Sequence, residues 1–195
     1  MNLEERMEAL PELKKEGEHL TLRHFNRKLG VRLDTGEIEA IEDGGPVSST
    51  EKLNVYTLLG YAAPGAKLLG EWMPFERLRH GAPFGPAFQR GVIQPFAATF
   101  AGHLAQLETA MKAMGGQRLG YSDMGYEVKA FECIPMRFLF WDGDDEFPAQ
   151  GNLLFDKSAT DFIHIESVVS IAMVGLDMAA KKAGLPLAKG ALSVS

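Results

Sequence analysis

Hydrophobic residues recur at helical spacing in three stretches of the chain. Between residues 93 and 114, and again between 164 and 183, apolar positions follow one another every three or four residues. This is the period of a helix that buries one face. A third helix is predicted near 48–62, because Ser48 and Glu51 have the spacing of a capping box.

Alternation of apolar and polar residues predicts strands in two other regions. Residues 18–41 alternate as in a small antiparallel meander with one wet face, and residues 126–156 contain three further apolar runs. The segment 64–92 is rich in Gly and Pro and is expected to be an irregular connection packed by aromatic side chains. The pattern predicts an α+β fold with a mostly antiparallel sheet, which three main helices cover in a single compact domain.

Punctuation residues suggest how the chain is divided. Gly17 ends an N-terminal helical segment over 1–17, and the α+β domain is expected to occupy 18–184. Gly184 and Pro186 stop the last helix, so residues 185–195 are predicted to form a loose C-terminal tail.

The charge balance excludes several classes of partner. The 195 residues include 26 Asp and Glu against 20 Lys and Arg, a net charge of −6. The cations form no stripe of the kind that nucleic acids need, and the local group at 23–32 is interpreted as a solvated strand face. We therefore expect no nucleic-acid partner.

The apolar runs and the N-terminus bear on localisation. No run approaches the ~18–20 consecutive apolar residues of a membrane span, so no membrane association is expected. The N-terminal residues lack the positive and apolar regions of a signal peptide. A cytoplasmic location is therefore expected.

The single cysteine limits cofactor chemistry. Cys133 lies among apolar residues and is predicted to be a small buried hydrophobe. Iron–sulphur clusters need about four thiolates, so no such cluster can be held by this chain alone. An internal disulfide is also excluded, because it would need a second cysteine.

The strongest polar feature is an acidic loop between Trp141 and Pro148. Clustered carboxylates repel one another unless solvent, Arg or a cation neutralises them, and calcium favours such oxygen ligands. The EF-hand pattern fails, because Phe147 stands where Gly is needed and Leu153 where Glu is needed. A solvated hairpin turn and a metal-binding loop both remain open. The metal candidates are Asp142, Asp144, Asp145 and Glu146.

Arg90 is the second polar candidate. It follows aromatic residues and precedes a helix, so it is expected either to pair with Glu71, Glu76 or the acidic loop, or to meet an anionic ligand. A ligand site is predicted between the aromatic-rich segment 70–91 and the acidic loop. Its expected residues are Glu71, Trp72, Phe75, Phe88, Arg90, Trp141, Asp144, Asp145 and Glu146.

Asp156 is predicted to lie apart from the acidic loop. If 134–141 pairs with 152–155 as a hairpin, the loop is at one end of the hairpin and Asp156 at the other, ~13 Å away. Asp156 is therefore expected to cap the following turn, with help from Ser158.

Two runs carry a resemblance to a known family. Residues 70–78 read Gly-Glu-Trp-Met-Pro-Phe-Glu-Arg-Leu, and residues 141–148 read Trp-Asp-Gly-Asp-Asp-Glu-Phe-Pro, followed by Leu-Leu-Phe-Asp at 153–156. Over roughly 15–180 the chain resembles a bacterial and archaeal domain family of unknown function. Its members are common in anaerobes and sometimes labelled putative iron–sulphur proteins. The resemblance implies that both runs are signature elements, and it implies no reaction.

Three functions follow as hypotheses. The first is a small-ligand-binding or accessory module in anaerobic metabolism. The second is a metal-assisted hydrolase or transferase, in which the acidic loop holds the cation and Arg90 stabilises developing negative charge. The third is a homodimeric or scaffold protein that associates through exposed aromatic residues. No catalytic residue is indicated, and catalysis is left open.

Overall fold

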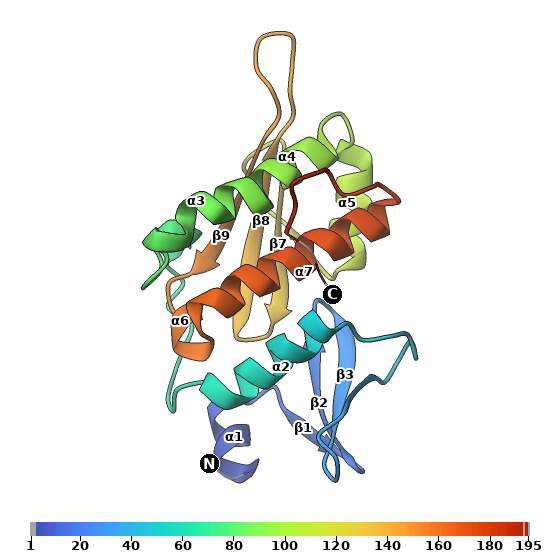
Figure 1. Cartoon of the computed structure of the whole chain (residues 1–195), viewed down its shortest axis with the longest axis vertical. Coiled ribbons are helices and arrows are strands. Elements are labelled where there is room, and N and C mark those ends of the chain that lie inside the picture. The colour runs from blue at the N-terminus through green and yellow to red at the C-terminus, as the bar shows by residue number, and fades with distance from the viewer. Residues whose placement is uncertain (1–2, 193, 195) are drawn as a thin grey trace.

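The computed structural model describes residues 3–192 and 194 and confirms the α+β class (Figure 1). Residues 1–2, 193 and 195, which belong to the predicted N-terminal segment and tail, lie outside the described residues. The strands form two antiparallel sheets, so the prediction of one sheet is wrong in this respect. The smaller sheet lies at the N-terminal end of the molecule and the larger one fills the middle (Figure 1).

The smaller sheet contains the meander expected over 18–41 and also includes residues 14–16, which lie in the segment 1–17 predicted to be helical. Its strands follow one another in the order β1 (Lys14–Glu16), β2 (His19–His24), β3 (Arg27–Arg32) and β4 (Ile38–Ala40). Helix α1 (Leu3–Ala9) precedes it. Helix α2 (Ser49–Tyr61) follows it, and the predicted capping box is confirmed. The Ser48 hydroxyl accepts from the Glu51 N–H at 3.1 Å, and the Glu51 carboxylate accepts from the Ser48 N–H at 2.8 Å.

The larger sheet has its longest strands at its centre. Its order is β5 (Trp72–Pro74), β9 (Gln150–Asp156), β8 (Ile134–Trp141), β7 (Met124–Phe131) and β6 (Gln117–Arg118). The two sheets touch where the turn after β2 meets β7, and there the Phe25 N–H donates to the Ala130 carbonyl at 3.0 Å. A single bond of this kind does not extend into a ladder, so the sheets stay separate.

The helices cover one face of the larger sheet. Helix α7 (Ile165–Ala183), preceded by the single turn α6 (Ala159–Phe162), matches the predicted helix at 164–183. The predicted helix at 93–114 is wrong as one element. It consists of α4 (Gln94–Phe100) and α5 (Leu104–Ala113), because Gly102 between them adopts a left-handed φ of +73°.

The segment 64–92 is more regular than its composition suggests. It contains β5, two short 3-10 helices, helix α3 and a π-helical turn that leads directly into α4. These elements are η1 (Phe75–Arg77), η2 (Ala82–Phe84), α3 (Gly85–Phe88) and the π-helical turn (Gln89–Ile93). The described part of the C-terminal tail crosses this helix, where the Leu192 N–H donates to the Gly91 carbonyl at 3.0 Å and the Ala188 N–H to Thr99 Oγ1 at 3.0 Å.

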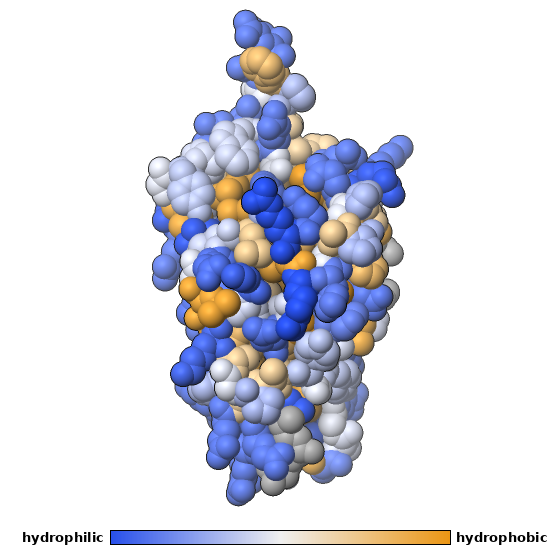
Figure 2. All heavy atoms as spheres, turned by 90° about the vertical axis from the view of Figure 1, so that its left-hand side faces the viewer, coloured by the Kyte–Doolittle hydropathy of each residue, from blue (hydrophilic) through white to orange (hydrophobic). Residues whose placement is uncertain are grey.

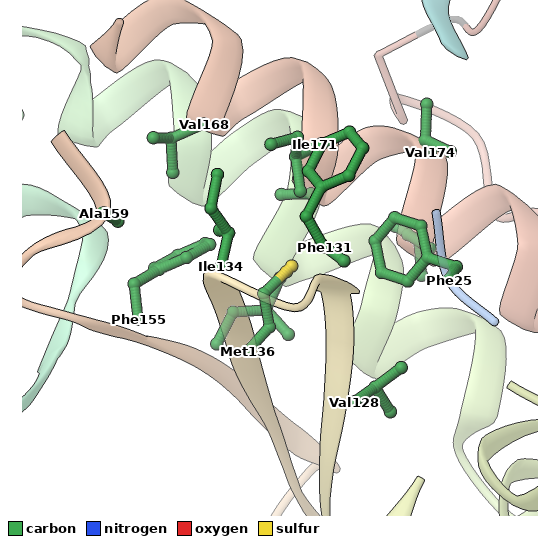
Figure 3. Packing of buried hydrophobic residues seen from close by; sticks show 14 of the residues in the cluster. Phe25, Val128, Phe131, Ile134, Met136, Phe155, Ala159, Val168, Ile171 and Val174 are labelled. Carbon is green, nitrogen blue, oxygen red and sulfur yellow. The ribbon is translucent and has the colours of Figure 1, made fainter. Parts of the chain in front are cut away.

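The main core lies between α7 and the larger sheet. Figure 3 shows Val168, Ile171 and Val174 on α7 facing side chains of the strands and of the turn between β7 and β8. Phe131 at the end of β7 and Ile134 at the start of β8 flank that turn and are buried. No helix formed by the described residues combines the length and apolar character that a membrane span requires.

A buried polar chain joins the smaller sheet to the rest of the molecule. His24 is 0% exposed, stacks on Phe131 at 4.3 Å, and its Nδ1 lies 2.7 Å from the Ala130 carbonyl oxygen. Its Nε2 meets the Asn54 side-chain amide at 3.4 Å, and Asn54 Oδ1 accepts from the Ser170 hydroxyl at 2.6 Å. The chain therefore connects β2, β7, α2 and α7 through neutral groups.

Candidate functional site

Of the aromatic residues in the predicted ligand site, Phe75 and Phe88 lie in the core, whereas Trp72 is half-buried and Trp141 is 39% exposed. Phe75 and Phe88 are 1% and 3% exposed, and their rings stack at 4.3 Å. Phe155 of β9 meets both rings edge-on. The structure thus brings Phe75 and Phe88 together, but they pack against each other and the sheet and leave no room for a ligand.

The polar residues near them are exposed or engaged elsewhere. Glu71 pairs with Lys157 at 2.8 Å, and the Arg137 guanidinium lies 3.8 Å from the centre of the Trp72 ring. Arg90 lies on the outer side of the π-helical turn and forms no ion pair with any described residue. The expected pairing of Arg90 with Glu71, Glu76 or the acidic loop is therefore wrong.

The acidic loop lies at the far end of the hairpin from Trp72. In the register of β9, Gln150 pairs with Trp141, whereas Asp156 pairs with Trp72. Six residues of strand separate the two ends, about 20 Å. Figure 1 shows the β8–β9 hairpin extending beyond the body of the molecule. The predicted site residues on 70–91 and on the acidic loop therefore do not line one cleft.

We call the hairpin loop 142–149 the acidic arm. Asp142 Oδ1 accepts from the Gly102 N–H, and Asp144 Oδ1 accepts from the N–H groups of Glu146 and Phe147, each at 2.8 Å. These two carboxylates thus shape the loop. No three or more His, Cys, Asp or Glu among the described residues are arranged to hold a metal ion. The metal site predicted at Asp142, Asp144, Asp145 and Glu146 has no support from this geometry.

Two other interpretations of single residues are confirmed. Cys133 is buried, and burial, together with the nearby Glu12 carboxylate, raises the pKa of its thiol. Asp156 caps the turn after β9, because its Oδ1 accepts from the Ser158 N–H at 3.0 Å and from the Ser158 hydroxyl at 2.5 Å.

A cavity lies where the smaller sheet meets the helical layer, and we call it the junction cavity. Its volume is about 480 Å³. The turn between β2 and β3, the loop before α2, the end of α5 and the second half of α7 form its walls. The lining residues are Phe25, Asn26, Arg27, Glu42, Asp43, Pro46, Ser48, Glu51, Ala113, Val174, Asp177, Met178, Lys181, Lys182 and Val194.

Arg27 organises the polar wall of the junction cavity. Its Nε and Nη2 donate to the two carboxylate oxygens of Asp43 at 2.8 and 3.0 Å, and Nη1 donates to Glu51 at 3.0 Å. The Arg27 side chain is 17% exposed, so it does not belong to a solvated strand face as expected. Hydrogen bonds from Arg27 and from the Gly45 N–H lower the pKa of Asp43. The wall is therefore charged and fixed in place at neutral pH.

Phe25 is one of the apolar residues of the lining and has an unusual backbone. Phe25 and Asn26 are the two central residues of the β2–β3 turn and have φ angles of 47° and 65°. A left-handed φ is uncommon for a bulky residue and costs of order 1–3 kcal/mol. The ring reaches α7 at Gly175, where an added Cβ would lie 2.8 Å from Phe25 Cζ. Packing against a glycine holds this strained turn against the helix.

Sequence reasoning missed the junction cavity because its residues come from segments far apart in the chain. The one local signal is the two-residue turn Phe25-Asn26, which separates two alternating runs as in a tight hairpin. That signal places the turn, but it does not place α7 beside it.

The comparisons with known proteins identify a family without a described activity. Residues 3–178 match the family described as "Domain of unknown function (DUF3786)", which covers nearly the whole chain. No curated protein and no solved structure matches the chain.

Proposed function

Because the chain belongs to the DUF3786 family, whose description names no activity, its role has to be argued from its own residues, and we propose that it is a small-ligand-binding module. The ligand would occupy the junction cavity. The observation that carries this proposal is a cavity of about 480 Å³ between the smaller sheet and the helical layer, with both charged and apolar side chains in its lining. Binding sites for small molecules have this size and this mixture of surfaces.

The construction of the cavity supports the proposal. Glu51 is buried, and it is held by both the capping box and Arg27, so the polar wall is formed before any ligand arrives. The strained turn at Phe25, which directly precedes Arg27 in the β2–β3 hairpin, also lines the cavity. Strained backbone is concentrated at functional sites, and a preformed wall loses little entropy on binding.

Filling the cavity is expected to abolish binding. Ala113 is an exposed residue at the end of α5 that lines the cavity, so Ala113→Trp adds bulk there without disturbing the core. The dye anilinonaphthalene sulfonate serves as the probe, and its fluorescence should saturate with the native protein at one equivalent. We expect Ala113→Trp to weaken this binding at least about tenfold, since the indole occupies the space of the dye.

The matched control is Ala105→Trp on the same helix. Ala105 is also exposed but does not line the cavity, so this variant should bind the dye as the native protein does. Equal binding by all three proteins, or no saturable binding at all, would contradict the proposal. If Ala113→Trp alone weakens dye binding, native mass spectrometry of the protein purified from its source would identify a retained natural ligand by its mass.

The proposed metabolic role rests on the family resemblance alone. A role in anaerobic metabolism is proposed because the resembling family is common in anaerobes. A metal-assisted hydrolase receives less support, because the four acids of the acidic arm do not converge and Arg90 lies on another part of the surface.

The acidic arm favours a second candidate function, docking to a partner protein. Figure 2 shows the hairpin tip as a hydrophilic projection with one hydrophobic group. Phe147 is 63% exposed, and the four acids of the arm form no ion pair with a described residue. An exposed aromatic anchor among unneutralised acids would suit a partner that has an apolar pocket with a basic rim.

A photo-crosslinking amino acid at position 147 tests this second function. In the organism that makes the protein, it should form an adduct with one protein, whereas the same group at Leu53, exposed on α2, should not. Asp145→Asn with Glu146→Gln should remove most of the adduct, because the partner's basic rim loses two of its acidic counterparts. The loop itself should keep its fold, since neither side chain makes the hydrogen bonds that shape it. An adduct that survives both substitutions, or none at position 147, would contradict docking through the acidic arm.

A further inference from the structure

The acids that line the junction cavity are all engaged by cations. Glu42 accepts two hydrogen bonds from Arg23, at 2.5 and 3.1 Å, and Asp177 pairs with Lys181 at 2.6 Å. Asp43 and Glu51 are bound by Arg27, as described above. A cationic ligand would have to displace one of these partners before it could pair with an acid.

The cations of the lining have capacity left over. A guanidinium carries five N–H donors, and the bonds from Arg27 to Asp43 and Glu51 use three of them. Lys182 forms no ion pair with any described residue, although it is close enough to Asp43 to contribute to the lowered pKa of that carboxyl. The lining holds four acids and three cations, but each acid already has a cationic partner, so the groups left to meet a ligand are the Lys182 ammonium and the two unused N–H donors of Arg27.

The apolar part of the lining lies beside these cations. Val174 and Met178 are one turn apart on α7, and Lys182 follows Met178 by one further turn on the same helix. Phe25 and Pro46 face them from the smaller sheet and its loop. One helix face thus leads from an apolar region to an unpaired ammonium group.

We propose that the junction cavity binds a small organic acid, with its anionic group at Lys182 and Arg27 and its apolar body against Phe25, Val174 and Met178. This inference rests on the proposed function and adds the chemical class of the ligand. The acid can bear a carboxylate, a sulfonate or a phosphate, since each accepts hydrogen bonds from ammonium and guanidinium groups. A neutral ligand of the same shape would bind through the apolar wall alone.

Three probes with one apolar body separate these possibilities. Phenylbutyrate, phenylbutanol and phenylbutylamine each carry a phenyl group on a short alkyl chain and end in an anionic carboxylate, a neutral hydroxyl and a cationic ammonium group, and each is titrated against bound anilinonaphthalene sulfonate. We expect phenylbutyrate to displace the dye at least about tenfold better than the amine, with the alcohol between them. Lys182→Gln should reduce the affinity for phenylbutyrate to that for the alcohol, whose own affinity should not change.

Lys67→Gln is the control, because it removes one positive charge from an exposed loop that does not line the cavity. It should keep the preference for the anion. A preference for the amine, equal affinities, or an anion preference that Lys182→Gln leaves intact would overturn the assigned ligand class. Those results would still leave a functioning cavity, provided that Ala113→Trp blocks the dye. Failure of the dye and of all three probes to bind would instead overturn the proposed function itself.

Discussion

Replacing Asp156 by Ala is expected to lower the free energy of unfolding by about 4 kcal/mol. Asp156 is 2% exposed, and its carboxylate accepts from the N–H groups of Leu69, Gly70 and Ser158 and from the Ser158 hydroxyl. Hydrogen bonds to a charged acceptor contribute about 1.5–3 kcal/mol each, and leaving the donors without a partner adds the cost of their desolvation. The variant also loosens the chain that enters β5, because the N–H groups of Leu69 and Gly70 lose their acceptor.

Urea unfolding at neutral pH, followed by circular dichroism, measures this loss. Asp145→Ala in the acidic arm is the control, since its side chain makes none of these bonds, and it should change stability by less than about 0.5 kcal/mol.

Burial acts to raise the pKa of Asp156, but the hydrogen bonds from Ser158, Leu69 and Gly70 outweigh it and lower the pKa. Its stabilisation is therefore complete above the unfolded value near 3.8 and is lost as the pH falls through the lower folded value. A difference between native protein and Asp156→Ala that does not shrink in acid would contradict this account.

Features that depend on neighbouring residues could be predicted from the sequence. The capping box at Ser48 and Glu51 is a local signal, and it correctly placed the start of α2. The apolar period of 164–183 correctly placed α7, because a helix buried along one face needs that period whatever lies opposite. The role of Asp156 followed in the same way, from the distance between the two ends of one hairpin.

Features set by tertiary contacts could not be predicted. Phe100 and Leu104 are four residues apart, so the helical period runs unbroken across Gly102, although α4 ends at Phe100 and α5 begins at Leu104. The reason lies on another element, since the Gly102 N–H donates to Asp142 at the base of the acidic arm. The predicted ligand site failed for a similar reason. Phe75 and Phe88 pack against each other in the core, and Asp144, Asp145 and Glu146 lie on the loop at the far end of the hairpin.

The junction cavity could not be predicted either, because its residues also meet only through tertiary contacts. Its charged wall was visible only as a basic run at 23–32, and sequence alone favours solvent exposure for such a run. Asp43 and Glu51 lie 16 and 24 residues after Arg27 and become its partners only when the loop before α2 folds back. Residues that pair across such a distance carry no local pattern.

The largest pH effect is expected from His24. Burial lowers its pKa from 6.5 to about 4, against the opposing influence of the Ala130 carbonyl and of Glu51. Below 6.5 the unfolded chain therefore binds a proton that the folded protein does not, and stability falls as the pH decreases towards 4. A difference of this size corresponds to a loss of about 3 kcal/mol across that range. Protonation would also disrupt the bond between His24 Nε2 and the Asn54 amide, because both groups would then be donors.

Urea unfolding between pH 7.5 and 4 would reveal this contribution, and two variants assign it. His24→Gln should be less stable than the native protein at neutral pH, because it loses the stack on Phe131. Its stability should change much less towards acid, because glutamine has no ionisable group. His103→Gln, at the start of α5 and outside the buried polar chain, should retain the native acid-side loss. Equal pH profiles for the native protein and His24→Gln would show that another group is responsible.

His24 joins β2 to β7, α2 and α7, so the acid transition should separate the smaller sheet first. Amide exchange in β2 and β3 should therefore rise before exchange in β8.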